Sequence, residues 1–465
     1  MRLLQRGSAR RARQAPAGLA VGAGRGRGPW FYGWTVVAVA FLTVAVALGT
    51  RAAFGVLLVA LVDAFGWGRG LTAGAIALNS LLWAASAAPL GALLDRWGPR
   101  RVFAGAAVLA GLGLVLAALA HEPWQLYLGM GVLAGIGFAP LQVNSQGVII
   151  ANWFVRRRGL AGGLVAAGVG VGTLVLAPFT QWVVGQAGWQ AAFLMLAALL
   201  ILGVAPLNAV LQRHRPEDCG LRPDGEREPA APRPAGLPGR VAGPSVREAL
   251  TRCRFWALAA SFLLGAVPLQ FLLAHGVAYL VDVGFSRELA ATVLGLSGAG
   301  TIGAMLLWGY VADRWGGEWA YTAGSLALMS SIGLLYLVAP GREGLLALYA
   351  VLFALGFASR QGLHAFMAAA LAQGRSLGAL MGILATHVAV GSAIGPALGG
   401  WVFDHTGSYQ PAFALALASA AVAVGCVWLA APRRGSLVSP LAGPAVGQHH
   451  RTRAPTHVRH QAPPR

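Results

Sequence analysis

Long apolar stretches alternate with short polar stretches along most of the chain. Each apolar stretch is close to the length of about 20 residues with which a helix crosses the core of a bilayer. Glycine is frequent inside them, which is typical of closely packed membrane helices, and they lack the alternation of an outer-membrane barrel strand. The pattern predicts an all-α membrane protein with twelve transmembrane helices. They are expected at residues 30–62, 71–94, 102–120, 125–151, 159–184, 189–211, 255–281, 289–312, 319–339, 344–371, 377–402 and 410–431.

Polar stretches divide these helices into two groups. Residues 213–252 are rich in arginine, proline and acidic residues. They predict a cytoplasmic linker between an N-terminal six-helix bundle at 29–212 and a C-terminal six-helix bundle at 253–432. Residues 1–28 are rich in arginine without an acidic residue. They predict a disordered cytoplasmic tail, with a transit-like peptide as the alternative. A second polar cytoplasmic tail is expected at 433–465.

Composition agrees with a membrane protein and excludes a soluble multidomain enzyme. Apolar residues make up 57% of the 465 residues and charged residues only 11%, whereas soluble chains carry about 25% charged residues. The 35 basic residues are all arginine, and with 15 acidic residues they give a net charge of +20. A chain this basic could bind nucleic acid, so the positions of the arginines must decide.

The arginines lie mainly on one side of the predicted helices. Arg69, Arg287 and Arg342 are the exceptions on the opposite side, and Arg51 and Arg360 fall within predicted helices. This bias is the positive-inside rule, so it explains the charge with the lipid bilayer as partner and without nucleic acid. It predicts a multi-pass protein of a bacterial-type inner membrane with both termini in the cytoplasm.

A short motif occurs once in each group of helices. Residues 91–98 and 309–316 both have the pattern G-x-x-x-D-R-W-G, and both lie at the end of the second helix of their group. An internal repeat of this kind is typical of transporters built from two related bundles. The charged residues of the two copies are Asp95 and Arg96, and Asp313 and Arg314.

This motif resembles the loop signature of the major facilitator superfamily and its weaker second copy. Within that superfamily, the chain is similar to the branch of monocarboxylate porters and oxalate/formate antiporters. The similarity rests on Tyr-Gly-Trp at 32–34 and on Asn-Trp-Phe-Val-Arg-Arg-Arg-Gly-Leu-Ala-Gly-Gly at 152–163. The resemblance covers about residues 29–432 and implies two bundles that rock around a central site.

The resemblance also implies a gate at the cytoplasmic end of the bundles. Asp95 is expected to cap a neighbouring helix, where the positive end of the helix dipole favours a carboxylate. Arg96 and Arg100 are expected to form ion pairs that exist in one state and break in the other, with Asp313 and Arg314 as the second copy. Basic loops that only fix topology are the simpler alternative for the arginines.

Two predicted membrane helices carry an arginine. Arg51 lies in 30–62 and Arg360 near the middle of 344–371, while the acidic residues fall in loops or at helix ends. A charge at this depth costs about 2.5–3.5 kcal/mol and usually marks a substrate path. An anionic substrate would supply the missing counter-ion through bidentate hydrogen bonds; the alternative is an arginine that snorkels or bonds backbone carbonyls. The resemblance favours Arg51, because monocarboxylate porters carry a substrate-linked basic residue about one position away.

Other polar side chains in the predicted helices are candidates for the same path. His275, His364 and His387 could carry protons or simply pack, and Asn144 could line a cavity or join helices by hydrogen bonds. His387 stands where oxalate transporters have a lysine, and residues 297–302 lack the charged residues that relatives carry there. The predicted substrate-binding residues are Arg51, Arg360, His387, His275 and Asn144.

We therefore expect a secondary active transporter of small organic anions, either monocarboxylates or short dicarboxylates, that works by alternating access. Protons or a counter-anion are the expected coupling partners, and a monomer is the expected state. Efflux of drugs or hydrophobic metabolites remains an alternative, because glycines in 377–402 resemble a motif of drug/proton antiporters. A membrane receptor with a transporter fold is a further alternative. The sequence has no catalytic, metal or cofactor-binding motif, so neither enzyme activity nor a cofactor is expected.

Overall fold

The computed structural model describes residues 31–223, 246–371 and 377–431. The side chains of 88, 246, 361–371 and 377–379 are not part of this description. The expected tails at 1–28 and 433–465 lie outside the described residues, and so do residues 224–245 of the expected linker.

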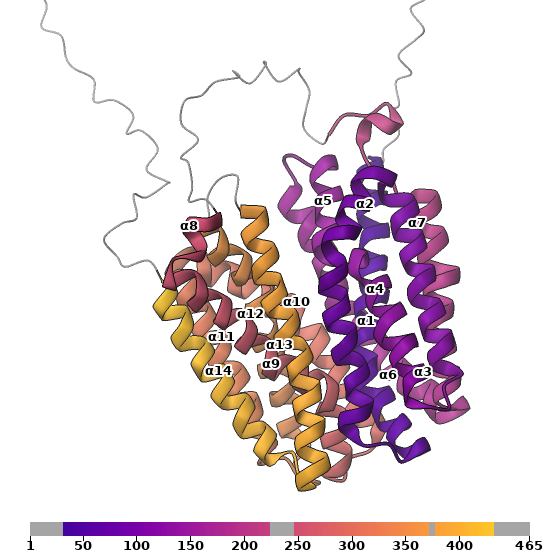
Figure 1. Cartoon of the computed structure of the whole chain (residues 1–465), viewed down its shortest axis with the longest axis vertical. Coiled ribbons are helices and arrows are strands. Elements are labelled where there is room, and N and C mark those ends of the chain that lie inside the picture. Colours follow the sequence, from indigo (N-terminus) through magenta and orange to yellow (C-terminus); the bar gives the residue numbers. More distant parts are fainter. Residues whose placement is uncertain (1–30, 224–245, 372–376, 432–465) are drawn as a thin grey trace, which may run out of the picture.

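The described chain is built from helices joined by short turns (Figure 1). The first half contains α1 (Tyr32–Phe65), α2 (Arg69–Ala118), α3 (Pro123–Leu126), η1 (Tyr127–Leu133), α4 (Ala134–Phe138), η2 (Ala139–Leu141), α5 (Val143–Trp153), α6 (Arg158–Ala198), η3 (Leu199–Val204), α7 (Ala205–Leu211) and η4 (Pro216–Cys219). The second half contains α8 (Val246–Leu250), α9 (Cys253–Asp282), α10 (Arg287–Trp315), α11 (Gly317–Leu335), α12 (Gly344–Leu371), α13 (Leu377–Thr406) and α14 (Gln410–Ala430).

Two of the long helices each contain a glycine with non-helical backbone angles. Gly98 in α2 has φ 76° and ψ 164°, and Gly188 in α6 has φ 85° and ψ 171°. A positive φ strains residues that have a side chain, whereas glycine adopts it readily. Each glycine therefore separates two arms, and the chain can reverse its direction between them.

Contacts of α6 and α7 with α1 show such a reversal. Directly after Gly188, the ring of Trp189 packs against Phe65 at the end of α1. Further on, the carbonyl of Leu211 accepts a hydrogen bond from Tyr32 at the start of α1, over 2.7 Å. The second arm of α6 and its continuation therefore run back along α1.

With both reversals counted, the described chain passes through the bundle twelve times, six times in each half. Nine described helical stretches are long and apolar enough to cross a membrane, and one of them, 158–211, holds two passes. The remaining passes are α11 and α12, and the apolar part of α12 is shorter, at 344–360. The predicted fold class, an all-α membrane protein with two six-helix bundles, is confirmed.

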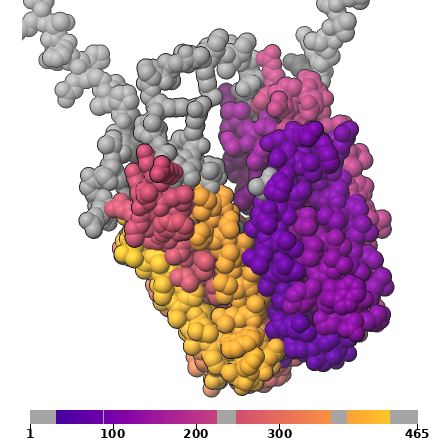
Figure 2. Space-filling view, viewed as in Figure 1, coloured from indigo at the N-terminus to yellow at the C-terminus, as the bar shows by residue number. Residues whose placement is uncertain are grey.

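The two halves meet at one end of the molecule and separate toward the other (Figure 1). We call the end that carries the last residues of α7 and the first of α9 the linker side, and the opposite end the far side. The first residues of the expected linker pack onto the first half, since Trp153 Nε1–H donates to the carbonyl of Arg213 over 3.2 Å. The space-filling view shows the halves in direct contact away from the linker side (Figure 2).

Glycines allow the backbones of the two halves to approach closely toward the far side. A Cβ atom at Gly55 would lie 2.5 Å from the carbonyl oxygen of Leu273. A Cβ atom at Gly400 would lie 2.5 Å from the Cα atom of Gly70. A larger residue at either position would force the helices apart, so the far side is closed by backbone packing.

Candidate functional site

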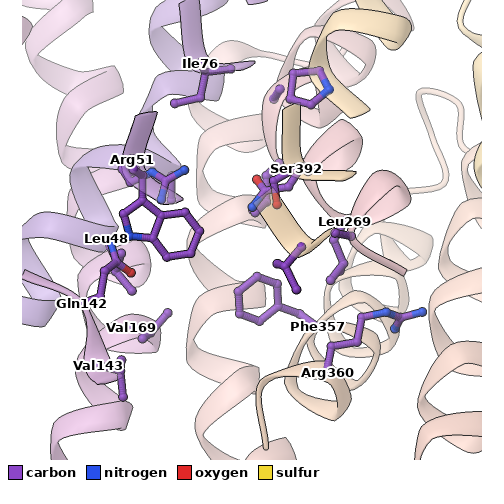
Figure 3. A pocket seen from close by; sticks show the side chains of 18 of the residues that line it. Leu48, Arg51, Ile76, Gln142, Val143, Val169, Leu269, Phe357, Arg360 and Ser392 are labelled. Atoms are coloured by element: carbon purple, nitrogen blue, oxygen red, sulfur yellow. The ribbon is translucent and has the colours of Figure 1, made fainter. Parts of the chain in front are cut away.

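A cavity of about 300 Å³ lies between the two halves. Side chains of α1, α2 and α6 and the start of α5 line it from the first half, and side chains of α9, α12 and α13 line it from the second. Figure 3 shows Arg51 and Gln142 on one side of this space and Leu269, Phe357 and Ser392 on the other. Most of the lining is apolar. Its polar residues are Arg51, Gln142, Asn144, Thr173, Gln270, Arg360 and Ser392.

Arg51 is held in the cavity wall by two residues of α2. Its Nη2–H donates to Ser80 Oγ over 3.2 Å, and its guanidinium carbon lies 5.2 Å from the ring centroid of Trp83. No acidic side chain within the described ranges forms an ion pair with Arg51. A guanidinium has several N–H donors, and a partly buried charge without compensation is costly. Arg51 therefore gives the cavity a site for an anionic group.

The fourth pass is interrupted beside this arginine. Gln142 has extended backbone angles, φ −83° and ψ 159°, so a new helix, α5, begins at Val143. Gln142, Val143 and Asn144 all line the cavity. The first N–H groups of a helix lack partners within the helix and carry the positive end of its dipole. The start of α5 thus adds positive potential to the cavity wall that also holds Arg51.

Arg360 also reaches the cavity wall, but its guanidinium is bonded to protein groups. Its Nη1–H donates to the carbonyl of Gly356 over 2.9 Å and its Nη2–H to Ser325 Oγ over 3.2 Å, and the guanidinium carbon lies 5.2 Å from the ring centroid of Tyr321. The side chain points away from Arg51 (Figure 3). The structure therefore does not bring the two arginines together around one ligand in this conformation.

Two of the predicted histidines, His275 and His387, do not line the cavity. His275 is buried, with Nε2 2.8 Å from the carbonyl of Pro396, which does line the cavity. His387 is partly buried, with Nδ1 2.8 Å from the carbonyl of Ile383 in its own helix. The side chain of His364 lies outside the described part of the chain. Of the five predicted substrate-binding residues, the structure places Arg51, Asn144 and Arg360 in the lining.

The repeated motif lies on the linker side, where the halves are apart. Asp95, Arg96 and Asp313 are exposed. Arg100 donates to a carbonyl in the last turn of α7 over 2.5 Å, and Arg314 to a tyrosine hydroxyl of its own helix over 3.3 Å. The two ion pairs that occur between described residues both lie on the far side. Within the described residues the expected gate pairs are thus not formed in this conformation, and Arg100 instead bonds a helix end.

Gly391 and Gly395 of α13 have a packing role. A Cβ atom at Gly391 would collide with the carbonyl oxygen of Leu263, and one at Gly395 with that of Val267. Both carbonyls belong to α9, so these glycines let α9 and α13 pack backbone to backbone. Close packing explains the pattern that resembled a motif of drug antiporters.

Several lining residues were missed by sequence reasoning, namely Trp83, Gln270, Phe357 and Ser392. Trp83, Gln270 and Phe357 look like ordinary membrane-helix residues in the sequence. The sequence reasoning also did not predict the helix break at Gln142. Pro140 lies just before that break and could have indicated it, because proline disrupts helical hydrogen bonding.

Two repeated six-pass halves around a cavity that both of them line define a membrane transporter. The family model of the Major Facilitator Superfamily matches residues 39–363 and, in a second alignment, 279–460. The chain belongs to this superfamily, whose members are transporters and not enzymes.

Curated relatives point to one branch of the superfamily. Human monocarboxylate transporter 11 is 34% identical over 295 residues, which is 63% of this chain and 58% of that protein. Rat monocarboxylate transporter 13 is 31% identical over 292 residues, which is 62% of this chain and 61% of that protein. The matched region therefore spans about three fifths of the length of these relatives.

Solved structures share the fold at low sequence identity. A bacterial homologue of the human lysosomal transporter Spinster, in an inward-facing and occupied conformation, matches with a TM-score of 0.63 and 16% identity over 87% of this chain and 97% of that chain. A variant of the nucleoside transporter NupG matches with a TM-score of 0.65 and 15% identity over 86% of this chain and 99% of that chain. Both likenesses concern the fold alone.

Proposed function

We propose that the protein moves small organic anions with a single carboxylate across the membrane by alternating access. The observation that carries the proposal is Arg51, a cation in a cavity wall with one hydroxyl as its hydrogen-bonding partner in the described chain. A carboxylate would satisfy its remaining donors in a bidentate, charge-assisted pair. The similarity to proteins named monocarboxylate transporters supports the same substrate class.

The cavity favours one negative charge over two. Arg360, the other cation in the lining, already has a carbonyl, a hydroxyl and an aromatic ring as partners. The wall opposite Arg51 carries apolar side chains, among them Leu269 and Phe357. The other polar side chains of that wall, Gln270 and Ser392, are neutral, so a second carboxylate would lose its hydration there without a free cation among the described residues to pair with. We therefore propose a monocarboxylate with an apolar body and disfavour a dicarboxylate.

The proposed cycle follows from the two-sided lining. A substrate that bonds Arg51 and also contacts α9 and α13 interacts fully with both halves only when they close around it. A ligand shifts an equilibrium toward the state that it binds more tightly, so the substrate favours closure on the linker side. The distribution of arginines supports a cytoplasmic linker side, and a bacterial-type inner membrane and a monomer complete the proposal.

We propose that substrate transport is driven either by exchange for another anion or by symport of a proton carried on a histidine. The carboxylates nearest the membrane, Asp63, Asp282 and Asp404, lie at the far ends of their helices, so the described passes hold no acidic residue at mid-depth. Uptake into vesicles with a pH gradient, compared with uptake driven by an internal carboxylate, separates proton symport from exchange.

The decisive experiment measures carboxylate binding to Arg51 variants of the purified protein. Arg51→Ala should weaken binding about 10- to 100-fold, because it removes the charged hydrogen-bond donor. Arg51→Lys should keep part of the affinity, since the charge remains while the bidentate geometry is lost. Arg342→Ala, on the far-side surface, is the control and should bind as the wild type does.

A neutral amide analogue of the tightest carboxylate completes the test. It should bind poorly to the wild type and lose little affinity in Arg51→Ala. If Arg51→Ala binds every tested carboxylate as tightly as the wild type, Arg51 is structural and the proposal is wrong. A dicarboxylate that binds more tightly than every monocarboxylate would overturn the preference for one charge.

A further inference from the structure

The far side holds charged residues that the proposed substrate site does not use. Arg69, the first residue of α2, forms a bidentate pair with Asp282, the last residue of α9, with Nη1–Oδ2 at 2.5 Å and Nη2–Oδ1 at 2.7 Å. The side chains are 15% and 33% exposed, so water screens this pair less than it screens an ordinary surface pair. The pair joins the first half to the second.

A second carboxylate of the second half binds the same turn of α2. Asp404, near the end of α13, accepts from the backbone N–H of Arg69 through Oδ1 and from that of Gly70 through Oδ2, each over 2.8 Å. These N–H groups are the unpaired donors at the start of a helix. The residue at the N-cap position, Gly68, offers no side chain of its own. Asp404 thus caps a helix of the other half.

The Arg69 side chain continues into a chain of hydrogen bonds that leads inward. Its Nη1–H donates to the hydroxyl of Tyr409 over 2.9 Å. A carbonyl oxygen only accepts, so His275 donates from Nε2 to Pro396, over 2.8 Å. Its Nδ1 then accepts from the Tyr409 hydroxyl over 3.0 Å. Each donor in this series of hydrogen bonds meets an acceptor, and the series ends at Pro396 in the cavity wall.

We propose that Arg69 is the latch of the far-side gate, and that Tyr409 and His275 connect this latch to the cavity wall at Pro396. Its carboxylate partners, Asp282 and Asp404, both belong to the other half, so the far side cannot open until both contacts break. The inference rests on the alternating access of the proposed function, but it does not depend on the identity of the substrate.

The nearby pair of Arg287 with Asp63 provides a matched control. It also joins the two halves on the far side, with an Nη2–Oδ2 distance of 2.6 Å. Its side chains are 45% and 48% exposed, and among the described residues neither side chain has a further hydrogen-bond partner that leads to the cavity. An exposed pair contributes little, so its loss should open the far side much less than the loss of the latch.

The test uses a single cysteine in the cavity as a reporter of access from each side. Cys219, Cys253 and Cys426 are replaced by alanine, Leu48→Cys is introduced, and its reaction with a membrane-impermeant maleimide is timed in vesicles of known orientation. Arg69→Gln should raise the far-side rate about tenfold and lower the linker-side rate, because the population shifts toward the opposite state. Asp404→Asn should act in the same direction.

Arg287→Gln in the same background should change both rates less than about twofold. Unchanged far-side rates in both Arg69→Gln and Asp404→Asn would overturn the latch. An equal rise from both sides would also overturn it, because it would indicate damage to the fold instead of a shift between states. The assay needs no substrate, so its outcome is separate from that of the Arg51 binding test.

Tyr409→Phe tests the part of the hydrogen-bond series that runs from Arg69 to His275 and Pro396. It removes the hydroxyl that bridges Arg69 and His275 and keeps the ring against Phe271 and Phe413. We expect a far-side rate about threefold above the wild type. A rate equal to the wild type would limit the device to the surface contacts and overturn the link to the cavity wall.

Discussion

Arg51 and Arg360 are residues of one type in the lining of one cavity, on opposite halves, and their surroundings differ. Arg360 is 3% exposed and bonds a carbonyl and a hydroxyl of the protein. Arg51 has one hydroxyl partner among the described residues and faces the space between the halves. Protein acceptors thus help to offset the cost of placing the Arg360 guanidinium in the membrane. Under the proposed function, the substrate carboxylate does the same for Arg51.

This difference predicts opposite effects of two substitutions. Arg360→Met should destabilise the protein by about 1–3 kcal/mol, because Ser325 and Gly356 lose a charged donor. Carboxylate affinity should change less than about threefold, since no ligand contact is removed. Thermal unfolding and carboxylate binding are measured on the same samples. Arg51→Ala should show the opposite result, with a large loss of affinity and little loss of stability. A large loss of affinity without a loss of stability in Arg360→Met would place Arg360 in the binding site.

The sequence predicted Arg51 and Asn144 as cavity residues, and it could do so because charge and polarity are unusual inside an apolar segment. It did not predict that Arg360 would be turned away, since its partners Ser325 and Tyr321 belong to another helix. Nor did it find Trp83 or Phe357, whose position depends on the rotation of each helix about its axis. Single-helix patterns do not determine that rotation when most faces are apolar.

Helices themselves follow directly from the apolar stretches, and the twelve expected passes agree closely with the structure. The one local surprise is the break at Gln142 within the stretch expected at 125–151. Hydropathy averaged over the whole stretch does not reveal such a break, because the short polar run at 142–146 is flanked by apolar residues on both sides. A broken helix is tolerated at membrane depth where it lines a cavity, which is where this one lies.

Packing between α9 and α13 gives a prediction at the level of helices. Gly391→Val should separate the two helices and destabilise the protein by about 1–3 kcal/mol, because the new side chain meets the carbonyl of Leu263. Gly382→Val, on the same helix with no described atom within 4 Å of its Cβ position, is the matched control. Thermal unfolding in detergent is the measurement. Equal stability of the two variants would contradict the packing role.

At the scale of the whole molecule, the two ends differ in how the halves are joined. The far side is held by two ion pairs, a cross-half cap and close backbone packing. On the linker side, the charged residues of the repeated motif are exposed or bonded within their own half. We interpret this difference as one state of a transporter, closed on the far side and open on the linker side. The linker-side gate is expected to form in the opposite state.

The gate motif predicts a variant that transports more slowly but inserts into the membrane normally. Asp95→Asn should reduce the transport rate about tenfold or more, because the charge is expected to stabilise the state in which the linker side is closed. Insertion should be normal, since acidic residues contribute little to topology. Uptake and membrane abundance are measured in the same vesicles, with Arg157→Gln as the milder comparison. Transport at the wild-type rate in Asp95→Asn would remove the gate role.

Asp404 has a consequence for how the pace of the cycle can change during evolution. Its two partners are backbone N–H groups, which every residue except proline supplies. Replacement of the Arg69 side chain therefore leaves both hydrogen bonds available, whereas a side chain at position 70 would meet Asp404 and the backbone of α13. The strength of the contact then depends mainly on the residue at position 404. The time for which the far side stays closed in each cycle can therefore be changed at position 404 separately from the Arg69–Asp282 pair. Variants of different turnover could arise from changes at this single position, without any alteration of the substrate site.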